Sequence, residues 1–253
     1  MNPFLSAVGR RLADYLTKPL PGRHVATTSP ELLAEALMPC DVLLVEGNTR
    51  ISSAIKYLTQ STWSHAALYV GPQPDWPRRG GEVVSLIEAD LHEGVRAIPL
   101  SEYASAHTRI CRPVGLHEQE AQQVIHFASS RMGHRYDLKH IFDLARYVLH
   151  TPPVPVKWRR RMIAMGSGDP TRAICSTLIA QAFQSVHYPI LPDIVPQPAL
   201  APDCDDCAKE VLHIRHHSLF VPRDFDVSPF FAVIKPRLLK NFDPHKLQWA
   251  DPD

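Results

Sequence analysis

Apolar and polar positions follow two different periods along the chain, and each change of period marks an expected element. Short apolar runs bounded by turn residues predict strands, whereas apolar residues that recur on one helical face predict amphipathic helices. Strands are expected at residues 42–45, 66–70, 82–89, 94–98 and 230–234. Helices are expected at residues 2–18, 30–37, 51–58, 116–132, 138–149 and from residue 175 onward. The mixture predicts an α+β protein in which the third and fourth strands form a hairpin.

Proline and basic residues suggest how the chain is organised. The prolines concentrate after residue 150, where long irregular connections are expected. We predict an N-terminal helical extension at residues 1–37, a core at residues 38–190 and an irregular C-terminal extension with a final strand at residues 191–253. Within the core, residues 151–172 contain several prolines and the basic run Lys157–Arg161, and we interpret this segment as an insertion or lid.

The overall charge and the cysteine count exclude several classes of protein. The 253 residues carry 27 Lys and Arg against 26 Asp and Glu, so the net charge does not attract nucleic acid. Five dispersed cysteines are an odd number, which argues against a disulfide framework and leaves at least one free thiol. There is no apolar run of spanning length and no secretory signal pattern, which predicts a cytoplasmic protein.

Cys175 is the residue most suited to chemistry. It begins an expected helix, and the first turn of a helix lowers the pKa of a thiol because unpaired N–H groups favour the thiolate. Its helical neighbours at the same face, Leu178, Ile179, Ala182 and Phe183, are apolar, so its side chain should point inward. The alternative interpretation is an inert cysteine of the core.

A thiolate nucleophile needs a base, and His65 stands where a polar stretch meets the apolar strand 66–70. The base in turn needs an orienting partner, for which Glu88 at the end of the next strand is the best placed carboxylate. Asp90 and His92 are close enough in sequence to compete for that role. The alternatives are a histidine satisfied by a local backbone bond and a solvated carboxylate at a strand end.

Four spaced motifs resemble the permuted papain-like amidases of the YiiX and YaeF type, which are relatives of the NlpC cell-wall peptidases. The matching segments are Asp41–Leu44 with Ile55–Thr59, Trp63–Gly71, Gly133–Asp137 and Ile174–Ile179. In that family the histidine strand precedes the cysteine helix, which is the order found here. This sequence differs at Thr177, where the family often has glutamate, and at Cys40, where glycine usually precedes the aspartate.

The resemblance implies a circularly permuted papain-like, NlpC-like fold, in which a small antiparallel sheet or barrel packs on the nucleophile helix. It also implies Cys175 as nucleophile, His65 as base and Glu88 as third residue. The expected substrate-binding residues are Tyr136, Trp63 and Tyr69, which lie within the matching motifs. No metal or other cofactor is required.

The function predicted on this basis is a thiol-dependent hydrolase that cleaves an amide or ester bond through an acyl-enzyme on Cys175. The substrate would be a small molecule, a peptide or a lipid-like compound. The alternative is a non-catalytic module that keeps the fold and uses the cleft to bind a ligand or a membrane.

Two further features qualify this hypothesis. Cys204 and Cys207, followed by His213 and His216, have the residue types of a zinc site, but the pairs lie closer together than in common zinc fingers. The N-terminal amphipathic helix and the run Lys157–Arg161 are compatible with peripheral contact with an anionic membrane. The simpler interpretations are an acidic turn followed by a strand, and a helix packed on its own domain.

Overall fold

The centre of the protein is a six-stranded antiparallel sheet with the strand order β4-β3-β2-β1-β5-β8. We describe a computed structural model, which defines residues 14–20, 26, 28–134, 174–198, 208–236 and 243–246. The strands of the sheet are β1 (Val42–Glu46), β2 (His65–Gln73), β3 (Val84–Asp90), β4 (Gly94–Ile98), β5 (His107–Pro113) and β8 (Phe231–Ile234). Strands β4 and β8 are the two edges of the sheet and do not pair with each other. The sequence analysis expected either a small antiparallel sheet or a barrel, and the structure shows an open sheet.

Both faces of the sheet are covered, because side chains along a strand alternate between its two sides. Strand β1 shows this most clearly, since Val42 and Leu44 pack in one core cluster while Leu43 and Val45 pack in the other. A strand that is buried on both faces is apolar throughout, which explains the uninterrupted apolar run in the sequence.

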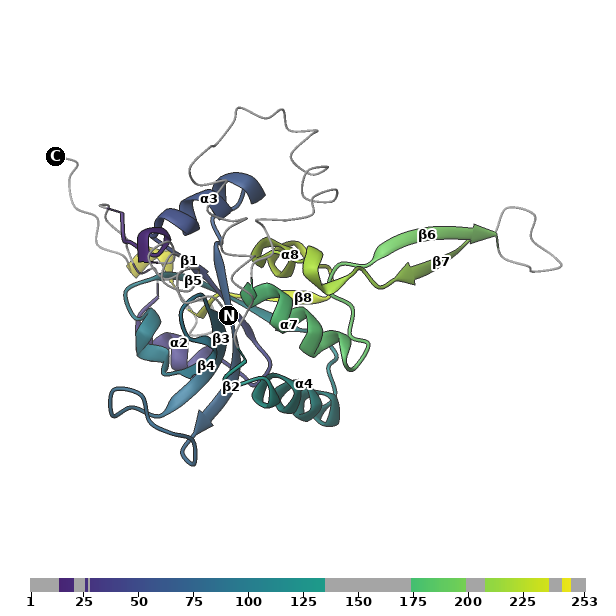
Figure 1. Ribbon diagram of the computed structural model, residues 1–253. Coiled ribbons are helices and arrows are strands. Elements are labelled where there is room, and N and C mark those ends of the chain that lie inside the picture. The colour runs from purple at the N-terminus through teal and green to yellow at the C-terminus, as the bar shows by residue number, and fades with distance from the viewer. Residues whose placement is uncertain are drawn as a thin grey trace, which may run out of the picture.

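Two of the longer helices pack on the first face. Helix α7 (Ile174–Gln184) contributes Cys175 and Phe183 to the same cluster as Val42, and helix α4 (Glu118–Ser130) lies beside α7 (Figure 1). The amphipathic pattern predicted both helices. The apolar residues of α4 recur on the side that faces the core, where Val124 and Ala128 are buried.

The opposite face is covered by α2 (Pro30–Ala36), whose Leu33 and Ala36 pack against Leu43 and Tyr69. The Ser29 hydroxyl accepts a hydrogen bond from Leu32 N–H at the start of α2, as the sequence predicted, and Pro30 occupies the first turn. The short helix η1 (Leu100–Tyr103) packs beside α2 on this face.

Helix α3 (Arg50–Thr59) connects β1 to β2 and ends in a left-handed residue, Gln60. The Thr49 side chain caps its first turn by accepting from Ser52 N–H. Because β1 and β2 are antiparallel neighbours, this helix stands at the end of the sheet where β2 begins, next to His65.

The C-terminal part adds elements that the sequence indicated only in part. The expected final strand is β8, which pairs with β5 and therefore belongs to the main sheet. Strands β6 (Asp193–Pro198) and β7 (Ala208–His213) form a separate two-stranded ribbon that extends away from the sheet (Figure 1). The short elements η2 (His217–Leu219), α8 (Pro222–Val227) and η3 (Pro244–Lys246) complete this part of the chain.

Strand β5 was not expected, although it lies between β1 and β8. Its sequence conceals the strand pattern because two arginines interrupt the apolar positions. Arg109 forms an ion pair with Asp226, and Arg112 forms one with Asp41. Residues that are distant in sequence therefore neutralise these charges, which a local pattern cannot reveal.

Several expectations concern residues outside the described part of the chain. These are most of the helix at 2–18, the helix at 138–149, the insertion at 151–172 with Lys157–Arg161, Tyr136, and the two cysteines of the zinc hypothesis, Cys204 and Cys207. The proposed domain boundaries also stay predictions. Among the helices that the structure describes, none has the length and apolar character needed to cross a membrane.

Candidate active site

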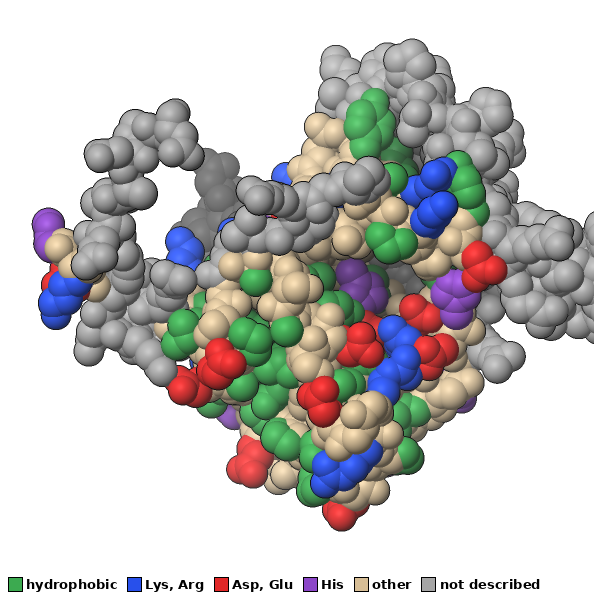
Figure 2. All heavy atoms as spheres, turned by 90° about the vertical axis from the view of Figure 1, so that its left-hand side faces the viewer, with side chains coloured by type: hydrophobic (Ala, Val, Ile, Leu, Met, Phe, Trp, Pro, Cys, Tyr) green, Lys and Arg blue, Asp and Glu red, His purple; other side chains and the backbone are tan. Residues whose placement is uncertain are grey.

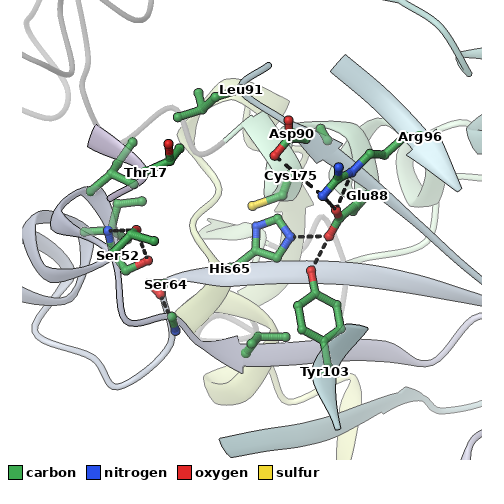
Figure 3. Close-up of a pocket in the computed structure, with 16 residues that line it drawn as sticks. Thr17, Ser52, Ser64, His65, Glu88, Asp90, Leu91, Arg96, Tyr103 and Cys175 are labelled. Carbon is green, nitrogen blue, oxygen red and sulfur yellow. Dashed lines mark hydrogen bonds and ion pairs between the residues drawn. The ribbon is translucent and has the colours of Figure 1, made fainter. Parts of the chain in front are cut away.

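Cys175, His65 and Glu88 come together at one end of the sheet, although the first two lie 110 positions apart in sequence. Cys175 is the second residue of α7, His65 is the first residue of β2, and Glu88 lies near the end of β3 (Figure 3). All three line one cavity of about 230 Å³. Packing of α7 against β2 and β3 brings the helix residue to the two strand residues.

The histidine ring contacts both of the other residues. His65 Nε2 lies 2.8 Å from Glu88 Oε2, and the ring also shares a hydrogen bond with the Cys175 side chain. Because Nε2 is engaged by Glu88, Nδ1 is the ring nitrogen left for the sulfur. The ring is therefore oriented from both sides, as a base in acyl transfer must be.

The pKa values of this pair move in opposite directions. Burial raises the pKa of the Cys175 thiol, but the charge and hydrogen bond of His65, together with the backbone N–H groups of Ala66 and Ser176, outweigh it and leave that pKa lowered. For His65, burial lowers the pKa, whereas Cys175 and Glu88 raise it well above its usual value. These surroundings therefore favour the thiolate form of Cys175 and the imidazolium form of His65.

Glu88 is 2% exposed and must be held by several partners to stay ionised. Its Oε1 accepts a hydrogen bond from Arg96 Nε at 2.8 Å and forms an ion pair with Arg96 Nη2 at 2.7 Å. Its Oε2 accepts from His65 and from the Tyr103 hydroxyl. Burial raises the pKa of Glu88, but these partners overcome that effect and lower it to about 2.

The sequence did not single out Arg96 or Tyr103. A signal for Arg96 was present, because it lies directly opposite Glu88 in the expected hairpin of β3 and β4, and opposite charges at such positions attract. Arg96 is held in turn by Glu93 and lies near Asp90. Tyr103 comes from η1 and carried no comparable signal.

The two competitors for the third position have other partners. The Asp90 Oδ1 atom accepts hydrogen bonds from His92 N–H and Glu93 N–H in the turn after β3. His92 Nε2 lies 3.1 Å from Thr17 Oγ1. Of these residues, Glu88 is therefore the one that contacts the His65 ring.

Trp63 and Tyr69, which were expected to bind substrate, do not line this cavity. Trp63 is 3% exposed, and its Nε1 donates to Asp226 at 3.0 Å. Tyr69 packs with Leu33 and Leu37 of the α2 side, four residues along β2 from His65. The closeness of Trp63 and Tyr69 to His65 in sequence did not predict where their side chains pack. Neither side chain contacts this cavity, so the structure gives no support to a substrate-binding role for them.

A zinc centre in the C-terminal region has no counterpart in the part of the chain that is described, where no cluster of three or more metal-ligating side chains occurs. His213 and His216 are described, but the cysteines that would complete the site are not. His216 Nδ1 lies 2.8 Å from Ser218 Oγ, at the start of η2. The zinc hypothesis therefore stays open.

A comparison with protein families gives a match over part of the chain. Residues 36–147 match the family described as permuted papain-like amidase enzyme, YaeF/YiiX, C92 family. The match covers less than half of the chain, so it is a similarity of that segment to the family. The matched segment of this amidase family contains His65 and Glu88 but ends before Cys175, so the place of Cys175 rests on the geometry described above. The expected α+β, permuted papain-like fold is confirmed by the family match and the open antiparallel sheet against α7.

A solved structure is also similar to the chain. It is described as the crystal structure of metalloprotein yiiX from Escherichia coli O157:H7, and it is 15% identical, with 79% of this chain and 97% of that chain covered at a TM-score of 0.46. The comparison with curated proteins found no match. Since the matched family is one of permuted papain-like amidases, a cysteine hydrolase in general is supported for this chain.

Proposed function

We propose that the protein is a cysteine hydrolase in which Cys175 is the nucleophile, His65 the general base and acid, and Glu88 the residue that orients His65. The observation that carries the proposal is the position of the His65 ring between the Cys175 sulfur and the Glu88 carboxylate. A histidine that served only the core would not need a buried carboxylate on one nitrogen and a thiol on the other.

The reaction follows from the charges of the pair. The Cys175 thiolate attacks the carbonyl carbon of an amide or ester, and a C–S bond forms while the electron pair of the C=O bond moves to oxygen. As the tetrahedral intermediate collapses, the C–N or C–O bond breaks and His65 gives its proton to the leaving group. Water then adds to the thioester carbonyl with His65 taking its proton, and cleavage of the C–S bond restores the thiolate.

The developing oxyanion needs a donor near the sulfur. We propose the backbone N–H of Cys175 for this role, since it lies at the start of α7 and helix N-terminal N–H groups favour negative charge. Glu88 keeps its charge throughout, because a carboxylate with a pKa of about 2 does not take a proton from His65 at neutral pH.

The proposal includes two types of scissile bond, an amide and an ester. The family name supports an amide or peptide substrate, and an ester of the lipid acyl type reacts through the same acyl-enzyme. Both substrate types should be tested with the same set of variants.

The experiment is the hydrolysis of p-nitrophenyl esters and p-nitroanilides by the wild type, Cys175→Ala and His65→Ala. We expect both substitutions to abolish Cys175-dependent turnover, and intact-mass spectrometry to show an acyl adduct in the wild type only. Cys40→Gly is the matched control, because it removes another buried thiol at a position with φ of 71°, which glycine adopts readily. Equal turnover and no adduct in all four proteins would contradict the proposal and favour the binding module.

A further inference from the structure

Residues 14–20 border the cavity of Cys175, although they lie outside the segment that matches the amidase family, which begins at residue 36. Thr17 of this N-terminal segment is part of the cavity lining. In the view of Figure 3, Thr17 and Glu88 lie on opposite sides of the cavity, with the Cys175 side chain between them. The N-terminal segment therefore reaches the site, which the sequence motifs did not indicate.

The backbone of this segment is attached to the residues that begin α3. Pro19 forms an antiparallel β-bridge with Thr49, and Leu20 N–H donates to Asn48 O at 2.8 Å. Thr49 is also the residue whose side chain caps α3. The segment is thus paired, through adjacent residues, with the first turn of a helix that the sequence around His65 follows.

Two side chains hold the preceding residues of the segment. Leu16 is fully buried, and burial of an aliphatic side chain is favourable in proportion to its apolar area. The guanidinium carbon of Arg50, the first residue of α3, lies 4.1 Å from the centroid of the Tyr15 ring in a cation–π contact. Neither Leu16 nor Tyr15 belongs to the described cavity lining, so both fix the position of the segment rather than form the cavity wall.

A further attachment crosses to the turn after β3. Thr17 Oγ1 lies 3.1 Å from His92 Nε2, a contact that we call the latch, and Asp14 Oδ1 lies 3.9 Å from His92 Nδ1. The side chains of His92 and Asp14 are 34% and 72% exposed, so water competes for both contacts and each contributes little. The turn itself is fixed, because His92 N–H donates to Asp90 Oδ1 at 2.8 Å. The segment therefore connects two sides of the cavity, with the weaker attachment at the turn.

Charge does not give this cavity a preference for one kind of ion. The described lining combines the carboxylates of Glu88 and Asp90 with the guanidinium of Arg96, and Arg96 forms ion pairs with both. On the face in Figure 2, acidic and basic side chains intermix around a hollow that contains a histidine side chain. Because neighbouring charges of opposite sign cancel at a distance, size is the property of an incoming molecule that the segment can control.

We propose that residues 14–20 form a strap over the entrance to Cys175, which opens about its pairing with Asn48 and Thr49. In the closed position Leu16 is buried and the latch is formed. In the open position both contacts are broken, and a larger molecule reaches the sulfur. The inference rests on the proposed function only in taking Cys175 as the reactive group, to which it adds control of access.

The test compares two reagents of the same chemistry on the whole chain at one pH. Iodoacetamide is small, whereas an iodoacetamide joined to biotin by a neutral polyether is large and uncharged. Peptide mass spectrometry gives the alkylation rate of Cys175 with each reagent. The ratio of the large-reagent rate to the small-reagent rate cancels the thiolate fraction, because both reagents react with the same thiolate. This ratio should follow the open fraction of the strap.

Two variants remove the latch. Thr17→Val keeps the shape of the side chain without its hydroxyl, and His92→Ala keeps the backbone N–H that Asp90 accepts. Each should raise the ratio by about twofold to tenfold, the range that corresponds to the loss of one hydrogen bond. The double variant should equal His92→Ala, because both single changes remove the same contact. His126→Ala removes an exposed histidine of α4 outside the described lining and should leave the ratio unchanged.

A third variant acts without changing the described cavity lining. Leu16→Ala removes the buried side chain that holds the strap closed, so the ratio should rise by about tenfold or more. Leu33→Ala truncates another buried leucine, in the cluster under α2, and is the control for general destabilisation. It should leave the ratio unchanged.

The outcomes separate this inference from the proposed function. An unchanged ratio in the Leu16, Thr17 and His92 variants, or an equal rise in Leu33→Ala, would show that the strap does not control access, and the hydrolase would stand. A rise in His92→Ala without one in Thr17→Val would overturn the latch, because the bulk of His92 would then be the obstacle. If iodoacetamide alkylated Cys175 only as fast as an ordinary thiol, the proposed function would fail, and the ratio would still decide whether the strap exists.

Discussion

Nε2 of His65 and Oε2 of Glu88 lie 2.8 Å apart, and the carboxylate in this pair is almost completely buried. A buried carboxylate keeps its charge only when its partners compensate for lost hydration. Here Arg96, Tyr103 and His65 do so together. The same contacts that keep Glu88 ionised also orient the His65 ring toward Cys175, so the charge and the geometry of the site have one origin.

The first prediction concerns the reactivity of the cysteines. Cys175 should react with iodoacetamide at a lower pH than an ordinary thiol, because its pKa is lowered by His65. Burial raises the pKa of Cys40 to about 12 and that of Cys111 further, so both should react slowly in the folded protein. Peptide mass spectrometry over a pH series measures each rate.

His65→Ala is the informative variant in that experiment. Without the imidazolium, only backbone N–H groups oppose the effect of burial, so the pH profile of Cys175 should move upward. An unchanged profile would show that His65 does not activate Cys175.

The second prediction concerns stability at acid pH. The pKa of Glu88 is lowered from 4.5 to about 2 on folding, so this carboxylate stabilises the folded state above pH 4.5 and the contribution is lost as pH falls toward 2. For a group this buried the contribution is on the order of 3 kcal/mol. Urea unfolding at several pH values measures it.

Glu88→Gln should be less stable than the wild type at pH 7 and should lose less stability between pH 5 and pH 2. It should also lower the alkylation rate of Cys175 near neutral pH, because the His65 imidazolium loses a negative neighbour. If the free energy of unfolding fell equally between pH 5 and pH 2 in the wild type and in Glu88→Gln, this account of Glu88 would be wrong.

The third prediction concerns Arg96 as a positioning residue. Arg96→Met should move the Cys175 pH profile upward and reduce turnover, because Glu88 loses the hydrogen bond and the ion pair to its Oε1. Arg96→Lys restores the charge but not the two-pronged contact, so partial recovery is expected. Arg79→Met is the control, since Arg79 pairs with Glu93 rather than with Glu88.

The fourth prediction concerns Tyr103. Tyr103→Phe keeps the ring and removes only the hydroxyl that donates to Glu88. A hydrogen bond to a charged group contributes about 1.5–3 kcal/mol, so a fall in turnover of about tenfold or more is expected with little change in the circular dichroism spectrum. Turnover equal to that of the wild type would remove Tyr103 from the site.

The fifth prediction separates the fold from the chemistry. Asp41 is fully buried and is held by Arg112 and by Met38 N–H. Arg112→Met leaves that carboxylate without its ion pair and should lower the free energy of unfolding by about 3–5 kcal/mol. The pH profile of Cys175 should not move in the fraction that remains folded, because neither residue contacts the site.

The sequence by itself determined most of the local structure and singled out two residues, Cys175 and His65, that the structure places in contact. The apolar runs at 42–45 and 66–70 are strands, and the periodic segments that became α3, α4 and α7 are helices, because burial of one face depends on local spacing. The motif resemblance selected Cys175, His65 and Glu88 from five cysteines, fourteen histidines and many carboxylates.

Only the tertiary structure decided which side chains support that pair. It placed Tyr103 on Glu88, turned Tyr69 to the α2 side and buried Trp63 against Asp226, 163 residues away. It also inserted β5 beside β1, where distant aspartates neutralise its arginines. These relationships depend on pairings between remote segments, and local periodicity contains no information about which remote charge or ring will meet a given side chain.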